Sequence, residues 1–293
     1  MKTAHYIRLF FVFLVWSSDF ILGKYLVGYM DPILSVAIRF SFASALQLVL
    51  LFAKHEFVLP PYRDLFILFV IGVCVVGVRY PLSYIALQYT SPVNSALIGA
   101  FTPALTAVAA LLFLRQKIQP TQMLFIALSV IGVIFIVLGE PSSLANITTN
   151  PVDFLILFGT VLWSIYNVAG KSVMKRLTPL QASFYTCFFG LFIMWPLAFH
   201  GEACFEISAY PLNIWLCLFY IGLVGSGLGM YWWNSSIREM GTLKPTLLYN
   251  TIPLFTAILS FLFFQSIPNV TILFGGVLIL VGSIFITLTN EKK

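Results

Sequence analysis

Long apolar runs, each about the length of a membrane-spanning helix, alternate with short polar breaks along the whole chain. A helix that crosses the hydrocarbon core of a bilayer needs about 20 mainly apolar residues. These runs are apolar throughout, whereas the strands of a membrane barrel alternate polar and apolar residues over about ten positions. Proline, glycine and charged residues mark the breaks. The pattern predicts ten helices, over residues of about 6–28, 33–53, 64–88, 93–114, 121–139, 154–174, 180–200, 212–237, 245–264 and 269–288.

The composition supports this interpretation. Hydrophobic residues make up 60% of the 293 residues and charged residues only 9%, whereas an average soluble domain has about 25% charged residues. Ten spans of about 20 residues use most of the chain, which leaves no room for a soluble catalytic or sensory domain. We therefore expect an all-α integral membrane protein that lies in the lipid bilayer.

Lys and Arg in the short polar breaks predict the orientation of the helices, because short cytoplasmic loops carry an excess of these residues. With the N-terminus inside, Lys24 falls outside, and Arg39 and Arg79 lie within helices. The other thirteen of the sixteen basic residues fall inside: Lys2, Arg8, Lys54, Arg63, Arg115, Lys117, Lys171, Lys175, Arg176, Arg238, Lys244, Lys292 and Lys293. We expect both termini in the cytoplasm and the chain in a bacterial inner membrane. The net charge of +6 then reflects topology and indicates no nucleic-acid partner.

An internal repeat divides the chain into two halves, residues 1–140 and 141–293. Five spans in each half is an odd number, so the second half must cross the membrane in the inverted direction. Inverted repeats are common in secondary transporters, where the substrate site lies near the midplane between the halves. The matched residues include Trp16 and Trp163 and Lys24 and Lys171, which are 147 residues apart, and Pro103 and Pro253, which are 150 apart.

The repeated motifs resemble those of the EamA family in the drug/metabolite transporter superfamily. The resemblance rests on Trp16 to Lys24, on Asp31-Pro32 and Arg39-Phe40, and on residues 88–95 followed by Pro103 and Gly132, with Trp163 to Lys171, Pro253 and Gly282 in the later half. It implies ten spans in two inverted five-helix repeats. It also implies export or exchange of amino acids and other small metabolites.

Three charged residues within the predicted helices are candidates for the substrate site. A charge in the hydrocarbon layer is costly and usually faces protein or water. Asp19, Arg39 and Arg79 all fall in one layer, on the outer side of the membrane centre. One hypothesis is that Arg79 binds a substrate carboxylate and Asp19 a substrate ammonium; the alternative is that Asp19 pairs with one of the arginines as a structural bridge. Asp19 is also the candidate proton carrier, and proton coupling and exchange without protonation both stay open.

Other polar, aromatic and small residues at membrane depth could line a chamber or shape the helices. An aromatic lining would suit an apolar or cationic group, and a midspan proline permits a bend; close packing of the bundle is the alternative for these residues. Trp232 and Trp233 are expected in an aromatic belt at the inner interface. The candidate lining residues are Trp163, Tyr166, Asn167, Tyr249 and Asn250, and the candidate bends are Pro103, Pro253 and Gly227.

The sequence contains no recognisable catalytic or metal-binding motif. We therefore predict no enzyme activity, no metal and no cofactor. We predict a secondary transporter that moves small polar metabolites, most of all amino acids and related compounds, by alternating access. It is expected to be a monomer or a homodimer. The alternatives are a carrier of cationic drugs or quaternary amines and, from another class, a membrane-embedded lipid-modifying enzyme.

Overall fold

The computed structural model describes residues 2–115, 151–200 and 210–265, together with scattered positions between 120 and 132 and between 270 and 281. Every regular element in these described residues is helical. The predicted fifth and tenth helices lie outside the continuously described ranges. The other eight agree with the helices that are long and apolar enough to cross a membrane: His5–Leu26, Pro32–Ala53, Tyr62–Tyr89, Pro92–Phe113, Phe154–Val173, Pro179–His200, Leu212–Met240 and Leu243–Phe263.

Short capping signals define the helices of the first half. Asp31 is the clearest example, because its carboxylate accepts hydrogen bonds from the backbone N–H groups of Ile33 and Leu34, and proline follows it as the first helical residue. The elements of this half are α1 (Lys2–Leu26), α2 (Pro32–Ala53), α3 (Tyr62–Gly72), η1 (Val73–Arg79), α4 (Tyr80–Tyr89), α5 (Pro92–Gly99) and α6 (Thr102–Leu114).

The second half has the same sequence of elements. The span after the second long helix is again built from three consecutive segments, and the next span is again divided. The elements are α8 (Pro151–Val173), α9 (Pro179–His200), α10 (Leu212–Tyr220), η4 (Ile221–Leu228), α11 (Gly229–Met240), α12 (Leu243–Leu248), η5 (Tyr249–Thr251) and α13 (Ile252–Phe264).

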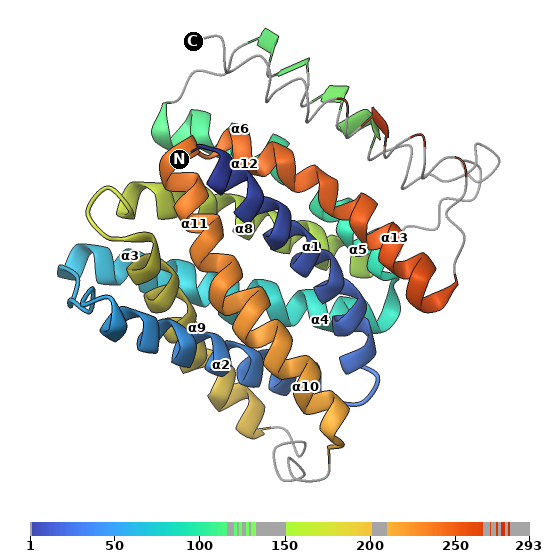
Figure 1. Ribbon diagram of the computed structural model, residues 1–293, viewed down its shortest axis with the longest axis horizontal. Coiled ribbons are helices and arrows are strands. Elements are labelled where there is room, and N and C mark those ends of the chain that lie inside the picture. The colour runs from blue at the N-terminus through green and yellow to red at the C-terminus, as the bar shows by residue number, and fades with distance from the viewer. Residues whose placement is uncertain are drawn as a thin grey trace.

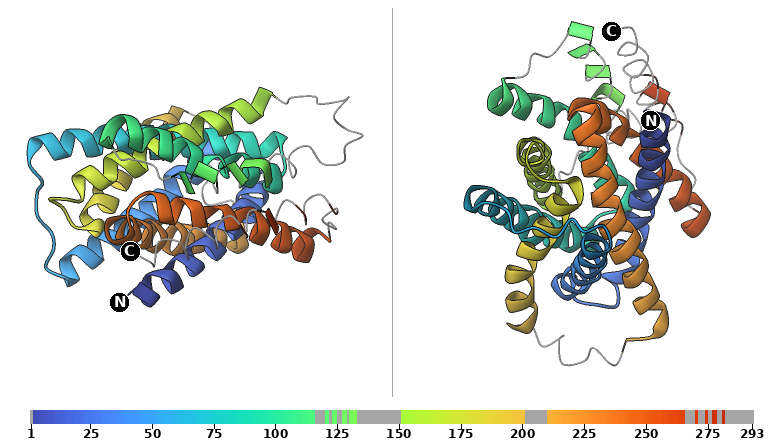
Figure 2. Two further views of the ribbon diagram at one scale, coloured as in Figure 1. Left: turned by 90° about the horizontal axis from the view of Figure 1, so that it is seen from above. Right: turned by 60° about the vertical axis from the view of Figure 1, so that its left-hand side comes forward.

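Helices from the two halves are interleaved in the bundle (Figure 1). The helix α2 packs along α9 and against η4, and η1 packs against α9. Seen from above, α6 and α8 run together on one side of the bundle and α1 and α13 on the other (Figure 2). The core therefore lies between the halves as much as within either of them.

Glycines permit the closest helix crossings, and these crossings occur in equivalent places in the two halves. A Cβ atom on Gly72 would lie 2.6 Å from the carbonyl oxygen of Thr186 on α9, and one on Gly222 would lie 2.9 Å from the carbonyl oxygen of Arg39 on α2. Glycine is required at both positions because the facing backbones leave no space for a side chain. Gly72 and Gly222 are 150 residues apart, and Arg39 and Thr186 are 147 apart, as in the sequence repeat.

Irregular helical segments also occupy equivalent positions. Both η1 and η4 are π-helical stretches within a long span. The fourth and ninth spans are interrupted directly before Pro103 and Pro253, in the second case by a 3₁₀ turn over Tyr249–Thr251. Wider, π-helical turns such as those of η1 and η4 are frequent at functional sites, and a 3₁₀ stretch within a helix often marks a hinge. Of the three predicted bends, two therefore lie next to an interruption, and Gly227 lies within η4.

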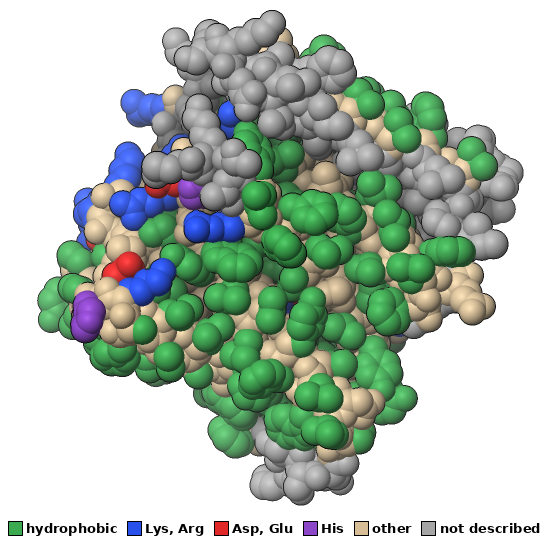
Figure 3. Space-filling view, in the orientation of Figure 1, with side chains coloured by type: hydrophobic (Ala, Val, Ile, Leu, Met, Phe, Trp, Pro, Cys, Tyr) green, Lys and Arg blue, Asp and Glu red, His purple; other side chains and the backbone are tan. Residues whose placement is uncertain are grey.

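The surface is mainly apolar, as expected of a chain in contact with lipid. Phe66, Leu112 and Leu216 each expose more than half of their surface, and contiguous exposed apolar area on this scale is rare in soluble monomers. In the space-filling view, Lys and Arg side chains gather at one edge, near the N-terminus and the start of α3 (Figure 3).

Candidate substrate site

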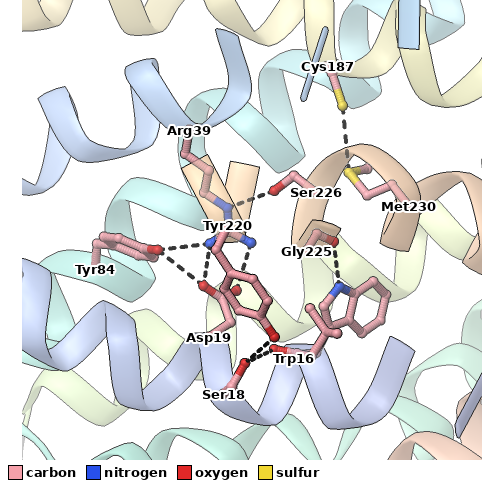
Figure 4. Close-up of polar contacts among 11 residues, drawn as sticks. Trp16, Ser18, Asp19, Arg39, Tyr84, Cys187, Tyr220, Gly225, Ser226 and Met230 are labelled. Carbon is pink, nitrogen blue, oxygen red and sulfur yellow. Dashed lines mark hydrogen bonds and ion pairs between the residues drawn. The ribbon is translucent and has the colours of Figure 1, made fainter. Parts of the chain in front are cut away.

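Arg39 is the centre of a buried hydrogen-bond network at the contact of α1, α2, α4 and η4 (Figure 4). Its side chain is 0% exposed. Its Nη1 and Nη2 atoms donate to the two carboxylate oxygens of Asp19, at 2.8 and 2.7 Å. Nη1 also donates to the Tyr84 hydroxyl at 2.9 Å, and Nε donates to the Ser226 hydroxyl at 2.7 Å. A guanidinium that binds a carboxylate through two parallel bonds forms the strongest type of ion pair in proteins.

Asp19 is thus paired with Arg39, which gives this part of the membrane layer no net charge. Its Oδ1 atom also accepts a hydrogen bond from the Tyr84 hydroxyl at 3.2 Å. The Asp19 side chain keeps 15% exposure, because one edge of the carboxylate faces a small cavity. The pair joins α1 to α2, and the bond to Ser226 joins both to the second half.

Arg79 has different surroundings, although it lies in the same layer. It forms no ion pair with any residue that the structure describes, and its buried Nη1 atom has no hydrogen-bond partner among them. Its guanidinium carbon lies 4.5 Å from the centre of the Tyr80 ring and 4.7 Å from that of Trp163, an arrangement in which the ring faces stabilise the cation. Gly159 makes room for this side chain, since a Cβ atom there would lie 3.1 Å from Arg79 Cγ.

Asp19 and Arg79 line the same cavity, whose volume is about 40 Å³. This is room for roughly three water molecules, far below the ~300–1,000 Å³ of a small-molecule pocket. A metabolite can therefore enter only if the helices around the cavity move apart. The cavity is lined by Asp19, Phe20, Arg79, Tyr80, Ser83, Tyr84 and Leu87.

A cluster of buried aromatic rings adjoins Arg79. The Trp163 ring stacks on Tyr166, with centroids 4.9 Å apart, and on Trp233, with centroids 6.0 Å apart. The centroids of Trp16 and Tyr249 lie 5.3 and 5.9 Å from that of Trp233. The rings pack against one another in the core of the bundle, and a larger cavity of about 210 Å³ lies apart from them, lined by Phe113 of α6 and by Ile165, Val168, Ala169 and Ser172 of α8.

A second, uncharged network includes Tyr166 of the aromatic cluster. The Asn234 side-chain amide donates to the Tyr166 hydroxyl at 2.7 Å and to Ser183 at 2.8 Å. In the repeat, Tyr166 is equivalent to Asp19 and Asn234 to Tyr84, at the spacings of 147 and 150 residues. Equivalent side chains thus form a hydrogen-bonded pair in each half, and only the pair of the first half carries charge.

Several buried polar atoms near the centre have no hydrogen-bond partner among the described residues. They are Trp163 Nε1, Asn167 Nδ2, and both polar atoms of the Asn250 amide. An unsatisfied polar group is costly in an apolar interior. These atoms are therefore available to a polar ligand or to water.

A family model confirms the resemblance that the motifs indicated. The model described as "EamA-like transporter family" matches the chain twice, over residues 4–138 and 150–288. The chain belongs to the EamA-like transporter family.

Relatives of this EamA-like chain bear transporter names. It is 31% identical to the uncharacterized transporter YyaM of Bacillus subtilis, over 94% of this chain and 91% of that protein. It is 25% identical to the uncharacterized transporter YetK of the same organism, over 98% of this chain and 88% of that protein. It is 29% identical to the uncharacterized inner membrane transporter YhbE of Escherichia coli, over 71% of this chain and 65% of that protein.

A solved crystal structure has the same fold, with a TM-score of 0.76 over 99% of this chain and 98% of that chain, at 18% sequence identity. Together with the family and the apolar helices, these matches support a multi-pass inner membrane protein with a transporter role.

Only some of the predicted site residues of this EamA-like chain lie at the cavity. Asp19 and Arg79 line the cavity, and Arg39 lies behind Asp19. Asn167 accepts a hydrogen bond from the Trp233 indole at 2.9 Å. The remaining candidates do not line the cavity: Trp163, Tyr166 and Tyr249 belong to the aromatic cluster, and Asn250 is buried in the ninth span.

Sequence reasoning missed four residues of this region: Tyr84, Ser226, Trp233 and Asn234. The placement of Trp233 in an interfacial belt is wrong, because the side chain is fully buried in the aromatic cluster. Tyr84 and Asn234 could have been found, since they are polar residues at equivalent positions of the repeat.

Proposed function

We propose that this protein is a secondary transporter of small polar metabolites that carry a carboxylate, with amino acids and related compounds as the leading candidates. The observation that carries the proposal is the difference between the two arginines. Arg39 is neutralised by Asp19, whereas Arg79 lines the cavity without an ion-pair partner in the described part of the chain. Among the residues that the structure describes, the cavity therefore carries one unbalanced positive charge.

A substrate carboxylate would satisfy Arg79. The guanidinium offers a planar set of donors that matches a carboxylate, and its Nη1 atom has no other partner among the described residues. The ammonium group of an amino acid would lie toward the exposed edge of Asp19 or over the face of a ring of the aromatic cluster. The unpartnered amide of Asn250 and the indole N–H of Trp163 are proposed as further contacts during transport.

The proposed architecture is ten helices in two inverted five-helix repeats, residues 1–140 and 141–293, with both termini in the cytoplasm. The duplicated glycine crossings, the two π-helical segments and the two paired networks support it. In such transporters one repeat rocks against the other around a midplane site. Pro103, Pro253 and Gly227 are the proposed bending points.

The main rival is a carrier of cationic drugs or quaternary amines. The aromatic cluster would suit a cation, but the unpaired charge of Arg79 would repel it. A single experiment can distinguish the proposal from this rival, because the two functions require ligands of opposite charge at one site.

The test is a thermal-shift screen of the purified protein with a panel of amino acids, organic acids and quaternary amines, followed by uptake into proteoliposomes. Arg79→Ala is the test variant, and Arg63→Ala, an exposed arginine at the start of the same span, is the matched control. We expect carboxylates to stabilise wild type and Arg63→Ala, and to lose this effect in Arg79→Ala. Stabilisation only by amines, intact in Arg79→Ala, would favour the rival. Uptake measured with and without an imposed pH difference separates proton coupling from exchange.

A further inference from the structure

Three side chains of the first half hold the π-helical segment η4 of the second half. The Trp16 indole donates to the Gly225 carbonyl oxygen at 2.9 Å, and the Gln47 amide donates to the Gly227 carbonyl oxygen at 2.9 Å. Between them, Arg39 Nε donates to the Ser226 hydroxyl at 2.7 Å. Three consecutive residues of η4 are therefore bound, and all three bonds are buried.

Close packing makes this attachment rigid. A Cβ atom on Gly222 would lie 2.9 Å from the Arg39 carbonyl oxygen, and one on Gly229 would lie 2.9 Å from Trp16 Nε1. The segment η4 thus lies close against α2, and the first residue of α11, directly after η4, lies against the Trp16 ring. Any relative movement of the two halves at this level must move η4 against α1 and α2.

The equivalent position in the first half lacks this attachment. Ser226 corresponds to Val76 in η1, which has no hydroxyl, and Arg39 corresponds to Thr186 on α9. The Thr186 hydroxyl has no hydrogen-bond partner among the described residues. The charged side chain of Arg39 thus binds the π-helical segment η4. At the equivalent position, only apolar contact among the described residues joins α9 to η1.

We propose that Ser226 is a positioning residue for transport, which links the state of the cavity to the conformation of η4 through Arg39 and Asp19. The inference rests on the proposed function in taking the cavity as the substrate site. Asp19 lines the cavity and binds both Nη atoms of Arg39, while the Nε atom of the same rigid guanidinium binds Ser226. A ligand that displaces the Asp19 carboxylate rotates the guanidinium and so moves its bond to Ser226.

Ser226→Ala removes the acceptor and leaves every cavity-lining residue in place. Ser236→Ala is the matched control, because Ser236 is equally buried and its hydroxyl bonds only to the Trp232 carbonyl oxygen within its own helix. Ser226→Thr, which keeps a hydroxyl, is the conservative variant. Each variant is first checked for wild-type elution and helix content in detergent.

Opening of the cavity is measured without any substrate. With its native cysteines replaced by alanine, the chain carries Ser83→Cys, at a cavity-lining position, and the rate of modification by a membrane-impermeant thiol reagent is followed in proteoliposomes. We expect Ser226→Ala to change this rate at least about five-fold, and Ser236→Ala and Ser226→Thr to leave it within about two-fold. Unchanged labelling in Ser226→Ala would overturn the proposal.

Transport provides the second measurement. With the amino acid or organic acid that stabilises wild type in the thermal-shift screen, we expect Ser226→Ala to keep its Kd within about two-fold and to lower the maximal uptake rate at least about ten-fold. Equal loss of binding and rate would show a merely structural role and would contradict the proposal. The failure of the proposed function would give a different result. Wild type would then bind no carboxylate, while the labelling rates of wild type and Ser226→Ala would still differ.

Discussion

The Asp19–Arg39 pair allows a quantitative test of the site as described. Both side chains lie within the bundle, two parallel hydrogen bonds of 2.8 and 2.7 Å join them, and Arg39 has no exposed surface. The perturbation is a double-mutant cycle of Asp19→Asn, Arg39→Gln and the combined variant. Each single change removes one charge and leaves the other inside the protein.

The expected magnitudes follow from the burial. Removing one partner of a buried pair costs about 3–5 kcal/mol, because the remaining charge is left without compensation. The combined variant removes both charges and keeps two amides that can hydrogen-bond to each other. We therefore expect the double variant to be more stable than the sum of the two single losses predicts, by at least about 2 kcal/mol.

The assay is unfolding of the purified protein by SDS in mixed micelles, followed by loss of helical circular dichroism. The control is the exposed contact in which Lys54 donates to the Tyr231 hydroxyl at 2.8 Å. For the cycle of Lys54→Met and Tyr231→Phe we expect a coupling below about 1 kcal/mol, because water competes for both groups. Additive losses at Asp19 and Arg39, within about 0.5 kcal/mol, would refute the reasoning.

Two further predictions concern packing and the ends of the spans. Gly72→Ala should lower the free energy of unfolding by about 1–3 kcal/mol, because its Cβ atom would lie 2.6 Å from the Thr186 carbonyl oxygen. Gly170→Ala is the control and should be neutral or stabilising, because its Cβ atom would have nothing within 4 Å. Equal melting temperatures for the two variants would contradict the close crossing at Gly72. Arg176 binds the carboxylate of Asp64, and this hydrogen bond raises the pKa of Arg176. Because Asp64 is buried and Arg176 half exposed, Arg176→Gln should lower the melting temperature more than Asp64→Asn does, and the reverse order would exclude this account of the pair.

The sequence predicted the positions of the spans along the chain well. The structure has eight of the predicted spans within the described residues. It also places Asp19 and Arg79 at one cavity and Arg39 against Asp19, which agrees with their similar positions along the apolar runs. Depth follows from counting residues along a helix, and it does not depend on how the helices are rotated or arranged. The family resemblance rested on the order of motifs in the sequence. A family model, which also compares sequence alone, confirmed it.

Partners across helices could not be predicted. Both arginines lie at a suitable depth for Asp19, and only the packing of α1, α2 and α4 brings Arg39 to it. Trp233 was misplaced for a related reason. Its place toward the inner end of the span indicated the interface, whereas the packing of α11 turns its ring into the aromatic cluster.

The glycine crossings also have a consequence for biosynthesis. Gly72 finds its close packing partner in α9, around Thr186 and Gly190, and η1 packs against both α9 and α8 of the second half. At about 5–20 residues per second, a ribosome needs roughly 6–24 s to pass from Gly72 to Gly190. During that interval the glycine face of the third span has no helix to cover it, so an inserted first half is an incomplete folding unit. The nascent chain must wait in the bilayer for its second half before either half can close.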